Sequence, residues 1–147
     1  MKRANRMQPV QKVVEANERA QAERLAASER RLSEAEHKLL DLEKYRSDYR
    51  AAYQDRVARG MSSASLRDYQ LFLARLGEAV RQQTQFVQAA RADRDRERSN
   101  WQHAARRAKA IDHVVEQWHA EERREVDRRE QRDADERAQR AKPIVLE

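Results

Sequence analysis

The fold of this chain is decided by residues 66–118, LRDYQLFLARLGEAVRQQTQFVQAARADRDRERSNWQHAARRAKAIDHVVEQW. Apolar residues return along this stretch at alternating intervals of three and four, and only Gln83, Arg94 and Glu97 interrupt the series. The apolar members are Leu66, Tyr69, Leu73, Leu76, Val80, Val87, Ala90, Trp101, Ala104, Ala108, Ile111, Val115 and Trp118. This is the a and d pattern of a heptad repeat, in which a helix packs one narrow apolar stripe against a partner helix. The pattern predicts a long coiled-coil helix over residues 66–118.

The partner helix is predicted from the residues that precede this stretch. Leu25, Leu32 and Leu39 recur at a spacing of seven and carry a weaker version of the same repeat. Proline is tolerated in the first turn of a helix and disrupts it further in, so this helix is expected to start near Pro9. The sequence therefore predicts a first helix over residues 9–57.

A turn is predicted between the two helices, over residues 58–65, ARGMSSAS. Gly60 suits the left-handed conformation that ends many helices, and one of the three serines that follow can cap the next helix. The chain is therefore expected to double back and to form an all-α fold. This fold is an antiparallel two-helix coiled-coil hairpin, which occupies residues 1–147 as a single coiled-coil domain.

Pairing of the helices around Met61 predicts which residues flank the seam. In the g positions beside the seam, which coiled coils usually fill with charge, the second helix carries Phe72, Ala79 and Phe86 and the first carries Tyr45 and Ala52. Because g faces g in an antiparallel pair, Tyr45 is expected on the same edge as Phe72. Two interpretations stay open: a widened core that stiffens the turn end, or a surface that docks a partner through exposed aromatic rings.

The seam fails beyond Trp118, because its next positions are Glu122 and Glu125. Residues 119–141 keep helix-forming side chains but present no apolar face. Pairs of Glu and Arg at helical spacing stabilise a helix by only a few tenths of a kcal/mol each, so a charged helical or frayed extension to about residue 141 is expected. Pro143 ends any helix there.

Composition agrees with a coiled coil and restricts the function. Charged residues make up 39% of the chain, and only two glycines and two prolines interrupt it, so a layered globular core is excluded. The absence of cysteine excludes disulfides and indicates a reducing compartment. No apolar run approaches a membrane span, and the first residues, MKRANRMQPV, lack the apolar middle of a signal peptide. A cytoplasmic protein is expected.

No catalytic, cofactor or metal site is predicted. The four histidines are scattered, and only His113, Glu116 and His119 approach a ligand spacing. There is no glycine-rich phosphate loop, and two helices alone do not form a concave pocket. The chain is therefore not expected to be an enzyme.

Two alternative functions are compatible with a long charged coil. Residues 91–109 carry seven basic side chains, which suggests a basic coiled-coil nucleic-acid-binding protein, but three acidic residues lie among them and would repel phosphates. A self-associating structural coiled coil is the other alternative. A hairpin that satisfies its own seam is expected to be a monomer when alone.

Three features resemble a known family: residues 39–53 (LLDLEKYRSDYRAAY), residues 59–83 (RGMSSASLRDYQLFLARLGEAVRQQ) and Trp101 downstream. They are similar to the flagellar export family FliJ, the soluble stalk component of the flagellar type III export apparatus. The resemblance implies a fold like the central stalk of rotary ATPases. It also implies that the end with the chain termini inserts into the hexameric ring of the export ATPase (FliI), and that the protein contacts the export gate membrane protein (FlhA) and helps recycle export chaperones. The protein is then expected at the flagellar base, peripheral to the inner membrane and held there only by its partners.

The resemblance also implies a set of residues that bind the export gate. The family's gate-binding surface matches positions Leu42, Tyr45, Tyr49, Phe72, Leu76, Ala79 and Gln83 of this chain. Tyr49 and Leu76 are also seam positions in the heptad register, so their substitution is expected to affect both folding and binding.

Overall fold

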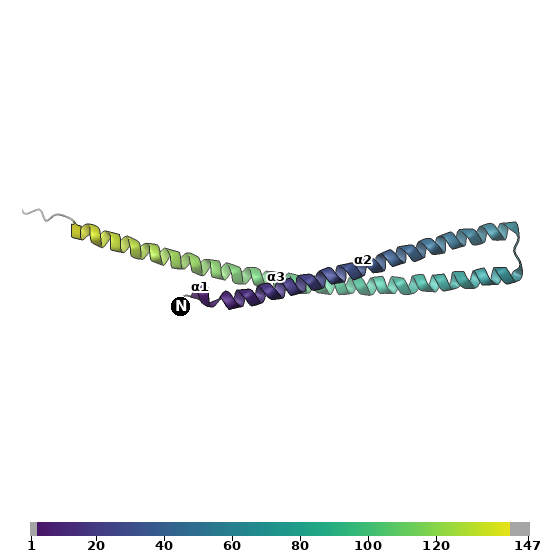
Figure 1. Ribbon diagram of the computed structural model, residues 1–147, viewed down its shortest axis with the longest axis horizontal. Helices are drawn as coiled ribbons and strands as arrows, with labels where there is room; N and C mark the ends of the chain where they lie inside the picture. Colours follow the sequence, from purple (N-terminus) through teal and green to yellow (C-terminus); the bar gives the residue numbers. More distant parts are fainter. Residues whose placement is uncertain (1–2, 142–147) are drawn as a thin grey trace, which may run out of the picture. The chain divides into compact units, whose positions relative to one another are not determined.

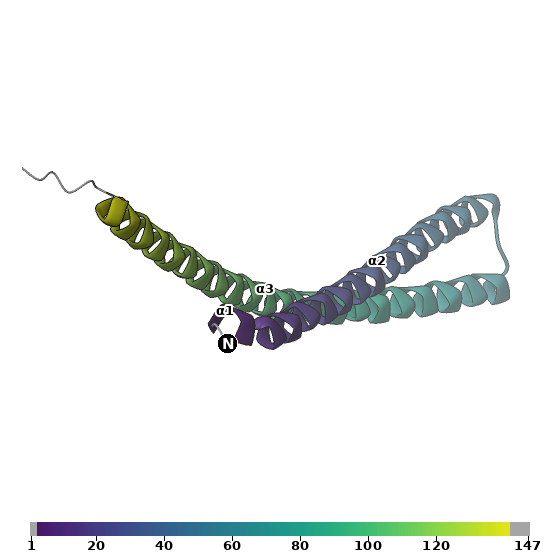
Figure 2. The ribbon, with the colours of Figure 1, turned by 60° about the vertical axis from the view of Figure 1, so that its left-hand side comes forward.

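The structure is a computed structural model that describes residues 3–141, and these residues form helices with short connections between them. A short helix α1 (Arg3–Arg6) is followed by the long helices α2 (Gln8–Arg59) and α3 (Ser63–Ala141). In the views of Figure 1 and Figure 2, α2 and α3 lie side by side and run in opposite directions. The predicted fold class, an all-α antiparallel coiled-coil hairpin, is confirmed.

The start of α2 accommodates proline as the sequence suggested. The helix begins at Gln8, so Pro9 occupies its first turn, where a missing backbone N–H removes no helical hydrogen bond. The N–H of Gln11 donates to the carbonyl of Met7 across 2.9 Å, and the N–H of Met7 donates to the carbonyl of Ala4 across 3.2 Å. These bonds connect α1 to α2 with almost no interruption of the helical path.

The turn is shorter than the eight residues predicted, because only Gly60, Met61 and Ser62 separate α2 from α3. Gly60 has a φ of 95°, a conformation that favours glycine, and its N–H donates to the carbonyl of Val57 across 3.2 Å. Ser62 caps α3, since its hydroxyl oxygen accepts a hydrogen bond of 3.2 Å from the backbone N–H of Ser65. These hydrogen bonds satisfy backbone groups at the end of α2 and at the start of α3. Both helices can therefore continue to within a few residues of Gly60.

Helix α3 continues well past Trp118, up to Ala141. Side chains from residue 123 to residue 141 are exposed. The helix carries polar contacts at helical spacing, including an ion pair of 2.8 Å between Arg129 and Glu125 and a hydrogen bond of 3.2 Å from Gln131 to Asp135. Of the two outcomes left open for this extension, the structure has the helical one. The predicted helix stop at Pro143 lies outside the described residues.

The chain divides into two compact units. The turn unit comprises residues 20–102, and the terminal unit comprises the described residues up to 19 and from 103 onward. The buried side chains of the turn unit all occupy seam positions predicted from the heptads. They are Ser28, Leu32, Leu76, Val80, Gln83 and Val87.

The terminal unit buries alanine and valine side chains, and polar contacts join α1 and the start of α2 to α3. Its buried residues are Ala4, Val14, Ala104, Ala108 and Val115, again at seam positions. Arg3 forms an ion pair of 3.0 Å with Glu121, and its guanidinium carbon lies 5.0 Å from the ring centre of Trp118. Gln11 donates to Asp112 across 3.2 Å. Pairing of the two helical arms therefore extends ahead of Pro9.

Polar seam residues of the turn unit differ in how well they are satisfied. The hydroxyl of Ser28 donates to the carbonyl of Leu25 across 2.7 Å, and the amide of Gln83 donates to the carbonyl of Ala35 across 3.0 Å. By contrast, Oε1 of Gln21 and Oε2 of Glu97 are buried and accept no hydrogen bond from the described residues. A buried acceptor without a donor costs about 1–3 kcal/mol, so these two positions weaken the seam.

Leu32→Ala should lower the free energy of unfolding by about 2 kcal/mol or more, because it removes buried methyl groups and leaves a cavity. Leu32 is 7% exposed. Leu40 lies on the same helix and is 62% exposed, so Leu40→Ala is the matched control and should change stability little. Urea unfolding followed by circular dichroism measures both. Equal losses in the two variants would contradict the position of the seam.

Glu97→Leu should raise the free energy of unfolding by about 1 kcal/mol, since it replaces a buried acceptor that has no donor with an apolar side chain. Glu23→Leu is the control, because Glu23 is an exposed glutamate of the same unit. Thermal unfolding of the two variants and the natural protein provides the comparison. A lower melting temperature for Glu97→Leu would show that this carboxylate stabilises the seam.

Candidate functional site

A cluster of five aromatic rings lies in the turn unit, next to the turn. Tyr45, Tyr49 and Tyr53 come from α2, and Tyr69 and Phe72 come from α3. Tyr49 is the centre of the cluster, with its ring centroid 4.5 Å from that of Phe72, 5.0 Å from that of Tyr69 and 6.3 Å from that of Tyr45. Ring pairs at these separations attract one another beyond the burial of their area, so the cluster holds the two helices together at this end.

The outer side of this cluster is exposed. The rings of Tyr45 and Phe72 meet edge to face, with centroids 6.2 Å apart and planes at 88°. The two side chains therefore share one edge of the coil, as their g positions predicted. Tyr45 is 52% exposed, whereas Phe72 and Ala79 are half-buried. We call the edge formed by Tyr45, Tyr49, Phe72 and Ala79 the aromatic edge.

Burial also affects the chemistry of Tyr49. Loss of solvent around its hydroxyl raises the pKa of Tyr49 above its ordinary value, and the neighbouring Tyr69 and Tyr45 raise this pKa further. The raised pKa of Tyr49 favours its neutral hydroxyl over the phenolate. The neutral hydroxyl keeps its hydrogen-bond donor and adds no charge to the aromatic edge.

The seven residues predicted to bind the export gate differ in their accessibility. Tyr45 is exposed, and Leu42, Tyr49, Phe72 and Ala79 are half-buried. Leu76 and Gln83 are buried in the seam. The amide of Gln83 is also engaged by the carbonyl of Ala35. The structure thus brings Tyr45, Tyr49 and Phe72 together at the surface and places Leu76 and Gln83 inside the coil.

Two members of the cluster were not predicted as part of the site. The rings of Tyr53 and Tyr69 lie 5.8 Å apart, and the hydroxyl of Tyr53 accepts a hydrogen bond of 3.4 Å from the amide of Gln70. The sequence contained the signal for this pair, because 53 and 69 add up to twice 61, which is the condition for facing each other around Met61. The heptad register by itself makes Tyr69 a seam residue and does not identify it as a member of the aromatic cluster.

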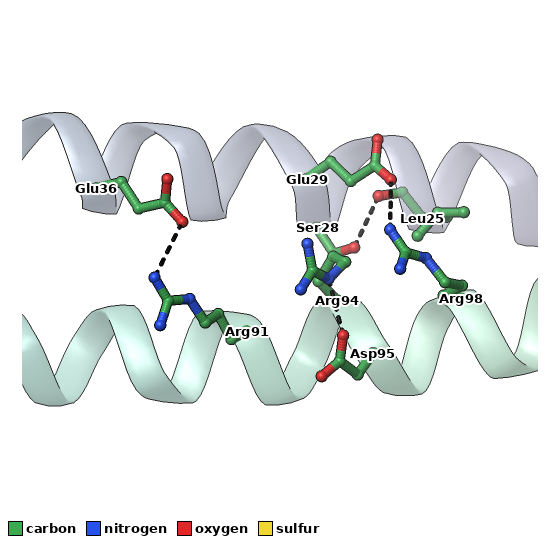
Figure 3. A network of polar contacts seen from close by, with 8 residues as sticks. All are labelled: Leu25, Ser28, Glu29, Glu36, Arg91, Arg94, Asp95 and Arg98. Carbon is green, nitrogen blue, oxygen red and sulfur yellow. Dashed lines mark hydrogen bonds and ion pairs between the residues drawn. The ribbon is translucent and has the colours of Figure 1, made fainter.

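The other edge of the turn unit carries charge instead of aromatic rings. Arg91 pairs with Glu36 across 3.7 Å, and Arg98 pairs with Glu29 across 4.0 Å, each pair joining α3 to α2 (Figure 3). We call this the ion-pair edge. The two edges that flank one seam are therefore chemically different, and the exposed aromatic ring of Tyr45 lies on the aromatic edge.

The basic run at residues 91–109 has much of its charge neutralised within the protein. Arg91 and Arg98 pair across the coil, and Arg94 contacts Asp95 across 2.9 Å (Figure 3). Arg96 contacts Asp93. A surface that tracks phosphates needs unpaired cations, so these contacts lend no support to nucleic-acid binding.

Neither a metal site nor a membrane span is found in the part of the chain that the structure describes. Within residues 3–141, no group of three or more His, Cys, Asp and Glu side chains is placed to hold a metal ion. None of the helices described there combines the length and the apolar character that crossing a bilayer requires.

Comparison with known proteins identifies the family. The family model described as "Flagellar FliJ protein" matches residues 1–142. No curated protein and no solved structure matches the chain. The match covers almost the whole sequence, and the structure is the all-α helical hairpin that the sequence predicts. The chain therefore belongs to the FliJ family of flagellar proteins, and its role lies in flagellar protein export.

Proposed function

We propose that this protein is a non-catalytic stalk that couples the export ATPase to the export gate. The end with the chain termini inserts into the ring of the ATPase (FliI), and the aromatic edge docks on the gate protein (FlhA). The protein also helps recycle export chaperones. It works in the cytoplasm at the flagellar base, binds the membrane only through its partners, and is a monomer when alone.

The aromatic edge is the observation that carries this proposal. Exposed Tyr45 lies against Phe72 beside a seam that is already filled, so folding of the hairpin does not require its ring to be buried. Tyrosine and phenylalanine are frequent anchors of protein interfaces, where a few well-packed rings supply most of the binding energy. The ion-pair edge offers no comparable surface, so docking through the aromatic edge would orient the coil in one way on its partner.

The proposed mechanism is mechanical and needs no chemistry on this chain. A two-helix coil that binds a different partner at each end transmits the state of one partner to the other if each state binds the coil with a different affinity. Hydrolysis of ATP then belongs entirely to the ATPase. Export of the substrate belongs to the gate.

The terminal unit supports the assignment of the ATPase contact. Arg3 is tied to Glu121 and Trp118, so α1 is held against α3. Beyond this point the side chains of α3 are almost entirely exposed and carry both signs of charge, without an apolar stripe of their own. A ring that surrounds this part of the helix can therefore contact it from every side.

Tyr45→Ala and Phe72→Ala should each weaken binding of the gate's cytoplasmic domain about tenfold or more, because each removes an aromatic anchor. Leu71→Ala is the matched control, since Leu71 is adjacent to Phe72 and 53% exposed but lies on the outer face of α3. Isothermal titration calorimetry measures the three dissociation constants.

The same variants also test the widened-core interpretation. Circular dichroism should show the helical content of Tyr45→Ala and Phe72→Ala almost unchanged. Substantial loss of helix, or an affinity for the gate equal to that of the natural protein, would contradict docking through the aromatic edge.

Addition of this protein to the purified export ATPase should raise the rate of ATP hydrolysis, because a stalk that binds only the assembled ring stabilises that ring by mass action. Tyr45→Ala should raise the rate equally, since the proposed ATPase contact lies in the other unit. Co-purification and a phosphate-release assay provide the measurements. A rate that does not respond to the natural protein would contradict the stalk function.

A further inference from the structure

The turn unit contains a groove that the proposed function does not yet use. It has a volume of about 420 Å³ and is lined by side chains of both α2 and α3. Its apolar lining comes from Ala35, Ala89, Ala90 and the ring of Phe86, which is 66% exposed. We call it the Phe86 groove.

The Phe86 groove lies on the same edge of the coil as the aromatic edge. Phe86 follows Phe72 by fourteen residues, and the groove residues Lys38 and Arg31 precede Tyr45 by seven and fourteen residues. Residues separated by whole heptads share one face of a coiled-coil helix. The contact between Tyr45 and Phe72 shows that these two faces meet across the seam. The groove is therefore the continuation of the aromatic edge away from the turn.

The charges around the groove are predominantly positive once internal pairs are removed. Asp93 is engaged by Arg96, whereas Arg31 and Lys38 have no carboxylate at ion-pair distance among the residues that the structure describes. Glu34 supplies a single negative charge, also without a cation at that distance among the described residues. On the ion-pair edge, by contrast, Glu29 and Glu36 are matched to arginines of α3. A groove that holds an exposed ring, two unmatched cations and one unmatched carboxylate is complementary to an apolar side chain flanked by carboxylates.

We propose that the Phe86 groove is the second half of the gate-docking edge. On this view it receives an apolar side chain, flanked by carboxylates, from the gate's cytoplasmic domain. This inference rests on the proposed function and extends it, because it makes docking a two-point contact. Two anchors separated by two heptads along one edge fix both the position and the direction of the coil on its partner. Arg31 and Lys38 confer a dependence on salt that the aromatic edge alone would not have.

The experiment measures binding of the gate's cytoplasmic domain by titration calorimetry at 50 mM and 300 mM salt, concentrations that span roughly a twofold change in Debye length. Phe86→Ala should weaken binding by about tenfold at both salt concentrations, as loss of an aromatic anchor does. Because the Phe86 ring is exposed, its removal should leave helical content unchanged. The double variant Arg31→Gln, Lys38→Gln should weaken binding mainly at low salt and should flatten the salt dependence.

Two matched controls separate the groove from general effects. Leu40→Ala removes an exposed apolar side chain from the outer face of α2. The double variant Arg30→Gln, Lys44→Gln removes the same charge as the groove variant from exposed positions of α2 that do not line the groove. Both controls should bind the gate like the natural protein.

The possible results separate this inference from the proposed function. If Phe72→Ala weakens binding but Phe86→Ala and the groove charge variant do not, the groove inference is overturned and gate docking stands. If none of these variants weakens binding, both fail. An equal effect of the two charge variants would overturn the specific role of Arg31 and Lys38. Sedimentation that reveals a dimer lost in Phe86→Ala would instead make the groove an interface between two copies of this chain, which also overturns the inference.

Discussion

The narrow seam between α2 and α3 is the interaction on which the rest of the structure depends. Two helices can bury only one stripe of each, so every side chain that is buried in the described residues occupies an a or d position. Leu32, Leu76, Val80 and Val87 fill the turn unit, while alanines and valines fill the terminal unit. Because the remaining surface is in water, the positions that flank the seam have the largest influence on how this coil can bind a partner. They are the positions from which a side chain can reach the other helix and a binding partner at the same time.

The two edges of the turn unit carry different kinds of side chain at these flanking positions. Ion pairs such as Arg91 with Glu36 are largely exposed, so they contribute little to stability, but they satisfy the charges of their edge. Tyr45, Tyr49 and Phe72 instead pack on one another and leave part of their apolar surface in water. Exposed apolar surface on one side of a coil gives it a single direction of approach to a partner. The family's role lies in flagellar protein export, and this asymmetry is suited to the stalk function that we propose.

The seam of this coil contains several buried polar groups, and these differ in whether they have a hydrogen-bond partner. Ser28 and Gln83 are buried, yet each donates a hydrogen bond to a backbone carbonyl, which offsets part of the cost of burying a polar group. Gln21 and Glu97 each keep a buried oxygen without a donor from the described residues. Glu97 was visible in the heptad pattern as a charged residue at a position that is otherwise apolar. The bond from Gln83 to Ala35 was not visible there, because backbone acceptors become available only once the helices are placed side by side.

The sequence by itself determined the helices, the doubling back at Gly60 and the edge that Tyr45 shares with Phe72. All of these follow from local propensity and heptad spacing, which act over a few residues and are written directly in the order of side chains. The tertiary structure alone decided that the turn contracts to three residues, that Tyr49 contacts both Tyr69 and Phe72 at the centre of the ring cluster, and that the amide of Gln83 reaches the carbonyl of Ala35. These outcomes depend on how far each side chain reaches across the seam. Reach depends on rotamers and on the volume left by residues far away in the sequence, and heptad position specifies neither.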